Sequence, residues 1–472
     1  MTTVAATEPP VDETVRELMT RARAAQRVLE GYDQEAVDQV VRALAWSAWR
    51  PGNAERLARV AVETTGIGRY EDKVAKNRRK TLGTLGDLLA RRSVGVIHDD
   101  RDTGITEIAK PVGVVVAIVG STNPAATPVN KAMMALKARN AIIVSPSPLG
   151  LATCELVVEL IHRELERLGA PLDLVQHLPA PITKEGTRAL MAAADLVVAT
   201  GSQRNVHDAY SSGSPAIGVG SGNVPVIVEA SADLDDAVAK IVRSKIFDYA
   251  TSCSSENAVL LEGAVYDRGL DALRGAGGHL CTPEEKARLQ AAMWPEGTLS
   301  RDVIAHPPAH IAELAGLAPE AHEAAFLMVE EGGVGPDHPF SAEKLSVVLA
   351  VYRYEAFPDG VALAQRILDH SGAGHSAGIH TRDEAHAREL AHTLRVARVL
   401  VNQAHAFGNG GAWDNGLNFT LTMGCGTWAG NSISENLALH HFMNVTKLVR
   451  TVPERVPTEE ELLGPYLSRH GP

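Results

Sequence analysis

An alternation of short apolar runs with helical segments constrains the fold of this chain more than any other feature. The runs are GVVVAIVG, AIIVSPSP and ADLVVAT, at residues 113–120, 141–148 and 194–200, and they contain many β-branched residues. The segments 128–140 and 151–169 carry apolar residues at helical spacing. Strands and helices that alternate in this way predict a parallel sheet with helices on both faces, which places the chain in the α/β class.

The rest of the chain predicts a helical N-terminal part and a second α/β unit. Residues 12–92 have helical spacing that is interrupted at Pro51 and Gly52. From about residue 250 the chain predicts strands at 257–262, 344–354 and 398–403, and helices at 283–293 and 384–394. At 472 residues the chain is too long for one simple core, so we expect two domains, followed by a polar tail after Val449.

Charge and composition exclude several classes of protein. A net charge of −12 argues against a nucleic-acid surface, and it means that an anionic substrate needs locally placed cations. No apolar stretch reaches the roughly 18 residues that a membrane span needs. The four cysteines form no CxxC pair, which favours a reducing cytoplasm, and the 18 histidines form no metal-binding motif. We expect a cytoplasmic protein that uses no metal and binds neither membrane nor nucleic acid.

The glycine-rich stretch GVGSGN at 218–223 is similar to a dinucleotide-binding fingerprint, but its context differs. That fingerprint follows a strand and opens a helix, whereas here the strand-like VPVIVE comes next. The stretch therefore predicts a tight turn that leads into a strand.

Cys253 is the first candidate for chemistry. It follows the helix-like segment 235–247 and precedes the strand predicted at 257–262, and backbone N–H groups at such a junction stabilise a thiolate. The alternative is a small buried side chain, the commoner role of a lone cysteine. Cys425 lies in the loop 423–436, which is rich in Gly, Ser and Asn and suits a face toward substrate or cofactor, but it lacks this helix-to-strand context.

Asn123 is the second candidate, because it follows the strand predicted at 113–120 and precedes a helix. Ligands of α/β proteins bind in the crevice at the carboxyl ends of parallel strands. A side-chain amide there is able to donate a hydrogen bond to an oxyanion. An Asx turn that caps the next helix is the alternative, and the sequence leaves both open.

Three stretches taken together resemble the aldehyde dehydrogenase superfamily: 111–148, FDYATSCSSENAVL at 247–260, and the segment from ARVLVN to MGCGTWAGNSISEN at 397–436. They are more similar to its CoA-acylating branch, which includes acetaldehyde and sulfoacetaldehyde dehydrogenases. The resemblance runs from about residue 15 to about residue 450, with the motifs in the same order. It implies N-terminal helices with an NAD(P)-binding domain at 1–248, a catalytic domain at 249–430, and a segment at 431–472 that makes contacts in a homodimer or homotetramer.

The resemblance also assigns roles to individual residues. Cys253 matches the catalytic thiol of the family, and Asn123 matches the amide that holds the oxyanion. Glu343 falls where a glutamate contacts the nicotinamide ribose. Thr200 and Gly201 fall in the cofactor-binding turn.

One position departs from the hydrolytic members of the family. These carry a glutamate that activates water, and aligning Pro225 with the proline of that motif puts Val219 in its place, 34 residues before Cys253. Valine cannot take a proton, so coenzyme A is the expected second nucleophile. The alternatives are a hydrolytic aldehyde dehydrogenase and, outside enzymes, a catalytically silent protein of the same fold that only binds ligands.

The cofactor is expected to be NADP as well as NAD. Many hydrolytic relatives carry a glutamate after the strand at 141–148, and it repels a 2′-phosphate. Here the matching position holds Pro148, and the lysine that precedes it there is replaced by Ser145. Ser145 and Ser147 offer hydroxyl groups. Arg204 adds a cation near the cofactor turn, and a surface arginine without a role in binding is the alternative.

The substrate is expected to be a short aldehyde, with sulfoacetaldehyde as the first choice. The loop around NQAHAF and DNGL at 402–417 looks more like that of the sulfoacetaldehyde-oxidising members than the serine- and glycine-rich loop of the acetaldehyde-oxidising ones. A desolvated sulfonate needs several hydrogen-bond donors. His405, Asn402 and Asn415 are candidates from this loop, and His375 is a candidate from the same cleft. The alternative for His405 is that it only packs inside the loop. A general acetaldehyde or propionaldehyde dehydrogenase of the acylating type is the alternative.

Overall fold

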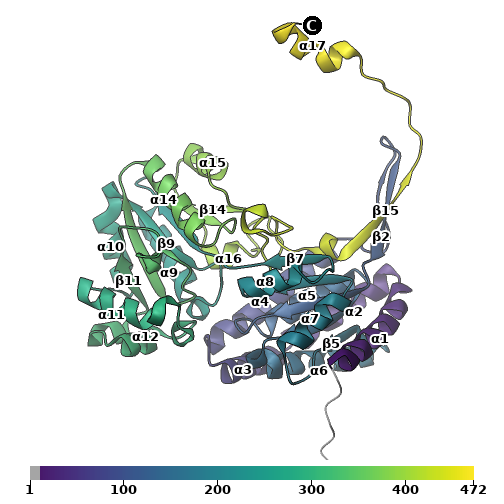
Figure 1. Ribbon diagram of the computed structural model, residues 1–472, viewed down its shortest axis with the longest axis horizontal. Helices are drawn as coiled ribbons and strands as arrows, with labels where there is room; N and C mark the ends of the chain where they lie inside the picture. Colours follow the sequence, from purple (N-terminus) through teal and green to yellow (C-terminus); the bar gives the residue numbers. More distant parts are fainter. Residues whose placement is uncertain (1–10, 472) are drawn as a thin grey trace, which may run out of the picture.

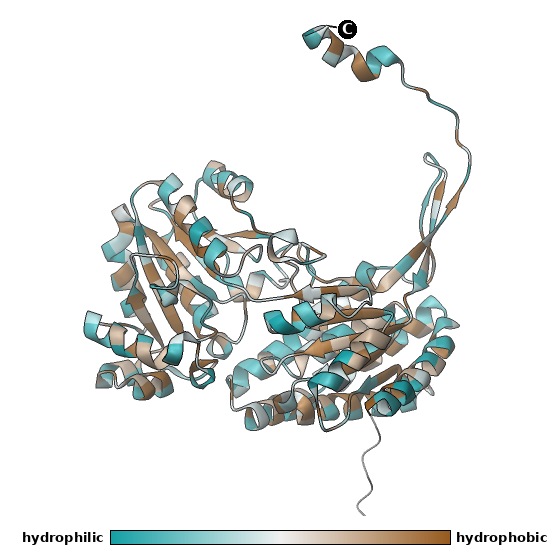
Figure 2. Ribbon diagram, in the orientation of Figure 1, coloured by the Kyte–Doolittle hydropathy of each residue, from teal (hydrophilic) through white to brown (hydrophobic). Residues whose placement is uncertain are grey.

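The computed structural model describes residues 11–471. Two α/β bodies stand next to each other, and a narrow arm of three strands projects from the first of them (Figure 1). The C-terminal helix α17 lies beyond the arm, away from both bodies. Apolar residues concentrate on the strands and on the inner faces of the helices (Figure 2), as burial of apolar surface requires.

The first body is built around a parallel five-stranded sheet with the strand order β5-β4-β3-β6-β7. Its strands are β3 (Val114–Val119), β4 (Ala141–Pro146), β5 (Val175–His177), β6 (Leu196–Thr200) and β7 (Ala216–Val219). The crossover helices are α5 (Ala126–Lys137), α6 (Leu151–Arg167), α7 (Lys184–Ala193) and α8 (Gln203–Tyr210). The parallel α/β sheet predicted from the alternating pattern is confirmed. The strand order reverses direction between β3 and β6, where α/β proteins bind ligands.

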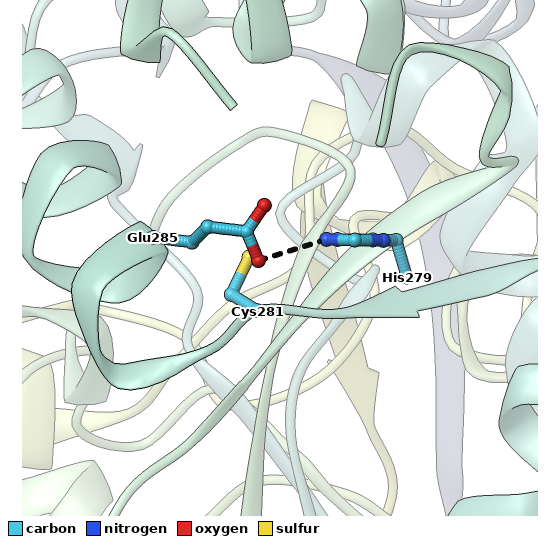
Figure 3. A group of neighbouring side chains, drawn as sticks. All are labelled: His279, Cys281 and Glu285. Carbon is cyan, nitrogen blue, oxygen red and sulfur yellow. Dashed lines mark hydrogen bonds and ion pairs between the residues drawn. The ribbon is translucent and has the colours of Figure 1, made fainter. Parts of the chain in front are cut away.

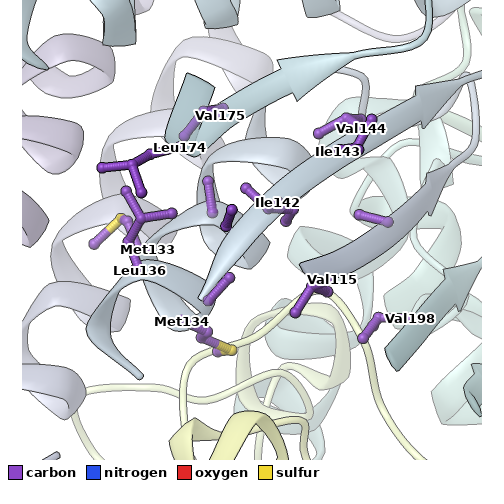
Figure 4. Close-up of a cluster of buried hydrophobic side chains, with 14 of the residues drawn as sticks. Val115, Met133, Met134, Leu136, Ile142, Ile143, Val144, Leu174, Val175 and Val198 are labelled. Carbon is purple, nitrogen blue, oxygen red and sulfur yellow. The ribbon is translucent and has the colours of Figure 1, made fainter. Parts of the chain in front are cut away.

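Four N-terminal helices complete the first body: α1 (Val11–Glu30), α2 (Gln34–Trp49), α3 (Asn53–Thr65) and α4 (Tyr70–Leu89). The predicted interruption at Pro51 and Gly52 separates α2 from α3. Side chains from α5 interlock with the apolar faces of the strands, and Figure 4 shows Met133, Leu136 and Ile142 in this core. Both faces of β3 and β4 are buried, which explains why their sequences read as continuous apolar runs.

The second body contains a parallel seven-stranded sheet with the order β10-β11-β12-β9-β8-β13-β14. These strands are β8 (Val224–Val228), β9 (Glu256–Glu262), β10 (Gly278–Leu280), β11 (Phe326–Glu330), β12 (Val348–Tyr354), β13 (Ala377–His380) and β14 (Val399–Val401). Its helices are α9 (Leu234–Ile246), α10 (Tyr266–Gly275), α11 (Pro283–Met293), α12 (Pro308–Ala315), α13 (Pro319–Glu323), α14 (Phe357–His370), α15 (Glu384–Thr393) and α16 (His405–Gly408). Strand β8 pairs with β9 and β13. The second sheet therefore includes residues 224–228, which precede the domain boundary expected at residue 249.

The glycine-rich stretch 218–223 connects β7 of the first sheet to β8 of the second. No helix follows it, so the prediction of a turn that leads into a strand is confirmed. The chain therefore crosses between the two bodies at this turn.

The arm consists of β1 (Gly95–Asp100), β2 (Ile105–Pro111) and β15 (Met443–Val449), and β2 pairs with both neighbours in antiparallel register. Beyond it, the polar tail expected after Val449 contains the helix α17 (Glu459–His470), which the sequence analysis did not predict. Thr458 and Glu461 form a capping box at its start, which is a local reason for this helix. Within residues 11–471, no helix is both long enough and apolar enough to cross a membrane.

Candidate active site

A cavity of about 320 Å³ lies where the carboxyl ends of β3, β6 and β7 face the second body. Asn123 and Cys253 both line it, so the structure brings together the two residues that the sequence singled out from segments 130 positions apart. The strand ends contribute small residues, namely Gly120, Ser121, Thr200, Gly201, Ser202, Gly220 and Ser221. A second set comes from α4 and from the segment 406–423, namely Lys76, Arg79, Lys80, Ala406, Gly410, Thr420, Leu421 and Met423.

The turn before Cys253 is held in an unusual backbone conformation. Asp248, Tyr249 and Ala250 have φ values of 51°, 49° and 58°, in the left-handed region that non-glycine residues seldom adopt. The buried carboxylate of Asp248 forms ion pairs with Lys73 at 3.2 Å and Lys76 at 2.6 Å. These contacts with α4 fix the turn, and with it the position of Cys253.

The thiol of Cys253 contacts an imidazole. The Nε2 atom of His375 lies 3.3 Å from the Cys253 sulfur. Burial, followed by the nearby carboxyl of Glu343, raises the pKa of Cys253 to about 12. Burial, followed by Arg398, lowers the pKa of His375 well below its usual value, so the imidazole is neutral near pH 7. A thiol with a raised pKa is protonated near pH 7 and needs a base to become a nucleophile. The neutral imidazole next to it is able to accept the proton.

Gly222 makes this contact sterically possible. A Cβ atom on Gly222 would lie 2.3 Å from the carbonyl oxygen of Cys253 and 2.9 Å from Nε2 of His375. The sequence pointed to a turn at 218–223 but missed this packing role. The glycine itself was the available signal, because an internal glycine beside a strand often marks a close approach of backbone.

The side chain of Asn123 is oriented by α4. Its Oδ1 atom accepts a hydrogen bond from Nζ of Lys76 at 2.8 Å, which leaves Nδ2 as the donor side of the amide. Nζ of Lys73 donates to the carbonyl oxygen of Thr122 and holds the adjoining backbone. In this arrangement the Asn123 oxygen is engaged by Lys76 rather than by an Asx turn. The amide nitrogen makes one long contact, at 3.4 Å, with the hydroxyl of Thr122, and its other N–H is available to an oxyanion.

Three of the residues expected around the cofactor line the cavity, and three do not. Thr200, Gly201 and Glu343 line it, and Glu343 accepts a hydrogen bond from the backbone N–H of Gly222 at 3.0 Å. Burial raises the pKa of Glu343 to about 8. Outside the lining, Ser145 is buried and bonded to Thr187, Ser147 caps the short turn at 148–150, and Arg204 is exposed.

The candidate substrate residues of the 402–417 loop do not reach the cavity. The Asn402 amide bonds to the backbone of Thr381, and the Asn415 amide bonds to Gln403 and to the carbonyl of Gly408. His405 is buried, and its Nε2 atom contacts the hydroxyl of Ser376 at 2.9 Å. Their polar atoms serve internal contacts, so the structure does not place sulfonate donors at these positions. His375 lies at the site, in contact with the thiol instead.

Cys425 is fully buried, and it does not line the cavity. The buried guanidinium of Arg398 holds this region together, because it donates to the carbonyl oxygens of His375 and Gly424. Through Arg398, the loop 423–436 is connected to the backbone of His375.

Three side chains of types that bind metals lie close together away from the cavity, between β10 and the first turn of α11. His279, Cys281 and Glu285 lie next to one another (Figure 3). The Glu285 carboxylate already accepts hydrogen bonds from the backbone N–H groups of Thr282 and Ala318 and contacts Nε2 of His279 at 3.1 Å. These contacts explain the group as a helix cap.

Comparison with known proteins identifies the family. The profile described as the aldehyde dehydrogenase family matches residues 2–280. A curated relative, sulfoacetaldehyde dehydrogenase (acylating) from Cupriavidus necator, is 53% identical over 460 residues, which is 97% of this chain and 93% of the relative. The chain belongs to the aldehyde dehydrogenase family.

Solved structures of the same fold agree with this assignment. An acetylating aldehyde dehydrogenase from Geobacillus thermoglucosidasius superposes with a TM-score of 0.91 at 36% identity, and covers 95% of this chain and 98% of that one. A propionaldehyde dehydrogenase from Rhodopseudomonas palustris, solved with bound CoA and an acylated cysteine, gives a TM-score of 0.81 at 25% identity, with coverage of 92% and 97%. The expected α/β fold of the family is confirmed.

Proposed function

We propose that this protein oxidises sulfoacetaldehyde to its acyl-CoA, with NAD(P) as hydride acceptor, through a thioester on Cys253. The observation that carries the proposal is the 53% identity to the acylating enzyme, which extends over 97% of this chain. The cavity supports it independently, because it combines a thiol, an amide donor and three cationic side chains. The same atoms serve the reverse reaction, the reduction of the acyl-CoA.

The first half of the reaction joins Cys253 to the aldehyde. His375 takes the thiol proton at Nε2, and the thiolate adds to the carbonyl carbon. The amide of Asn123 and the backbone N–H of Cys253 donate hydrogen bonds to the resulting oxyanion. Bound NAD(P) supplies the acceptor for the hydride that leaves this carbon, and the thioester remains on Cys253.

The residues at the strand ends fit a nicotinamide cofactor. Gly201 has a φ of 156°, and together with Gly120 and Gly220 it leaves room for a ligand to approach the backbone. Thr200 and Glu343 provide polar groups on the same wall. No carboxylate follows β4 at Ser147 or Pro148, which supports use of NADP besides NAD.

A chain of hydrogen bonds sets the protonation of His375. Its Nδ1 atom contacts the Ser376 hydroxyl at 2.7 Å, and that hydroxyl contacts Nε2 of His405. If the Ser376 hydroxyl donates to His405, then Nδ1 of His375 carries the proton and donates to Ser376. Nε2 of His375 is then the acceptor that the thiol needs, which gives His405 a positioning role.

The second half of the reaction needs a nucleophile other than water. Val219 is buried and does not line the cavity, and it cannot act as a base. Glu343 does line the cavity, but its raised pKa of about 8 keeps this carboxyl mostly neutral near pH 7. CoA then attacks the thioester as its thiolate, after its thiol proton has passed to solvent, and Cys253 leaves as the thiolate.

Reduction of NAD(P), followed by absorbance, tests this proposal with CoA and a panel of aldehydes. We expect kcat/KM for sulfoacetaldehyde to exceed that for acetaldehyde or propionaldehyde by more than about tenfold, because an uncharged aldehyde leaves the cationic side chains of the cavity without a partner. Cys253→Ala should abolish turnover, whereas Cys425→Ala should retain it. Equal turnover of uncharged aldehydes would leave a general acylating enzyme, and turnover independent of CoA would indicate a hydrolytic one.

A further inference from the structure

Three cationic side chains from one helix reach the cavity that contains Cys253. Lys76, Arg79 and Lys80 are spaced by three and four residues on α4, so they lie on one face of the helix. The segment 406–423 covers this face from the other side, and α4 and α16 lie near each other at the junction of the two bodies (Figure 1). On this face Lys76 and Lys80 are buried and Arg79 is partly buried, whereas a charged helix face is usually solvated.

Lys76 is fully engaged by the protein. Its ammonium donates to Oδ1 of Asn123, to the carboxylate of Asp248 and to the hydroxyl of Thr251, at 2.6–2.8 Å. An ammonium has three N–H groups, and these three acceptors use all of them. Lys76 therefore positions the catalytic amide and has no donor left for a substrate.

Arg79 and Lys80 are only partly engaged. Nη2 of Arg79 donates to the carbonyl oxygens of Phe407 and Gly411, but within residues 11–471 neither Nε nor Nη1 forms a hydrogen bond to a side chain or carbonyl. The rings of Phe407 and Phe419 lie 5.3 and 5.6 Å from its guanidinium carbon and fix its plane. Among the residues that the structure describes, Lys80 donates only to the carbonyl oxygen of Gly410.

These two charges lack a partner of opposite sign. Among the described residues, no carboxylate lies within ion-pair distance of Arg79 or Lys80, whereas the neighbouring Arg78 pairs with Glu55. Burial, followed by Arg79 and Lys76, lowers the pKa of Lys80 well below its usual value. Burying an unpaired cation is costly, and an anion that contacts both side chains would offset this cost.

We propose that Arg79 and Lys80 form the cradle for the sulfonate of the substrate. The identity of the anion rests on the proposed function, whereas the cradle itself rests on the geometry of α4. The sulfur of sulfoacetaldehyde is two bonds from the reacting carbon, whose oxygen is held by Asn123. Lys76 touches Asn123 directly, and one helical turn of about 5.4 Å separates Lys76 from Lys80. A sulfonate has three acceptor oxygens for the fork of Arg79 and the ammonium of Lys80.

The test compares Arg79→Met and Lys80→Met with Arg78→Met, a matched control on the same helix. For each cradle variant we expect kcat/KM for sulfoacetaldehyde to fall by roughly thirtyfold or more, as when one partner of a desolvated charge pair is truncated. The kcat/KM value for propionaldehyde should change by less than about threefold, since this aldehyde has no anionic group that could contact Arg79 or Lys80. Arg78→Met should change neither value. An equal loss for both aldehydes, or no loss for sulfoacetaldehyde, would overturn the cradle.

Calorimetric titration with ethanesulfonate separates the cradle from the proposed function, because this anion has the sulfonate but no reactive carbonyl. Binding to the wild-type chain should weaken at least about tenfold in either cradle variant and not in Arg78→Met. If binding depends on Arg79 and Lys80 while the wild-type enzyme shows no preference for sulfoacetaldehyde, the cradle stands and the substrate assignment fails. Ethanesulfonate that binds equally to all variants would overturn the cradle whichever aldehyde is oxidised.

Discussion

At the scale of single residues, the reactivity of Cys253 depends on groups that are remote in the chain. In the proposed mechanism the imidazole of His375 accepts the thiol proton, and Gly222 allows the close contact between the two. Glu343 acts in the opposite direction, because its carboxyl raises the pKa of the thiol. Nucleophile, base and carboxyl thus form one coupled set of titrating groups.

The pH dependence of thioester breakdown follows from Glu343. The pKa of this carboxyl is raised to about 8, so it is mostly protonated at pH 7 and becomes a base as the pH rises through 8. Without CoA, we expect hydrolysis of the Cys253 thioester to accelerate between pH 7 and pH 9. Measured as free acid formed after a single acylation, Glu343→Gln should show a shallower rise that reflects hydroxide alone. Equal slopes for the variant and the wild-type chain would rule out this role.

The sequence was sufficient to select Cys253 and Asn123, because each follows a recognisable element and matches a family motif. It did not assign the role of His375, since nothing in GAGHSAGIH indicates that this ring meets a cysteine 122 positions away. It proposed Asn402, His405 and Asn415 as donors for the sulfonate. These residue types suit an anion, but their side chains turn out to bond within the protein.

At the scale of elements, α4 joins catalysis to substrate recognition. Its Lys73 and Lys76 hold the strained turn at Asp248, and its next turn carries the cradle. The alternation of strands and helices was predictable because both faces of β3 and β4 are buried. The role of α4 was not predictable, because its pattern of Lys and Arg is typical of a solvated face, and only tertiary packing encloses it.

The enclosed cation of Lys80 should reduce the stability of the protein. Since burial lowers the pKa of Lys80 in the folded chain below that in the unfolded one, carrying its charge in the fold opposes folding at pH 7. Lys80→Met keeps a similar volume and removes the charge, so we expect a thermal midpoint at or above that of the wild-type chain at pH 7. The gain should shrink as the pH rises toward 10, where the unfolded lysine also loses its proton.

Scanning calorimetry at pH 7 and pH 9.5 measures this effect, with Arg78→Met as the surface control. A midpoint that falls by more than about 3 °C in Lys80→Met would show that the hydrogen bond to Gly410 outweighs the cost of the charge. A stabilised variant that has lost its preference for sulfoacetaldehyde would mean that stability is sacrificed for recognition at this position.

At the scale of the whole molecule, the arm of β1, β2 and β15 has apolar side chains that the described chain leaves uncovered. Val445 and Val449 are 43% and 67% exposed, and they lie four residues apart on one face of β15. A narrow three-stranded sheet is stable in water when an apolar face is covered or an edge is paired. No helix of either body covers this arm (Figure 1).

We propose that a second copy of the chain covers the arm, in the homodimer or homotetramer that the family resemblance led us to expect. Light scattering on the wild-type protein should give a mass of two or four chains of 50.1 kDa each. Val445→Asp combined with Val449→Asp should lower this mass toward one chain, because a buried carboxylate without a partner is costly. Leu314→Asp introduces the same charge at an exposed leucine of α12, far from the arm in sequence, and should leave the mass unchanged. A wild-type protein that remains monomeric at micromolar concentration would show that the arm has another role.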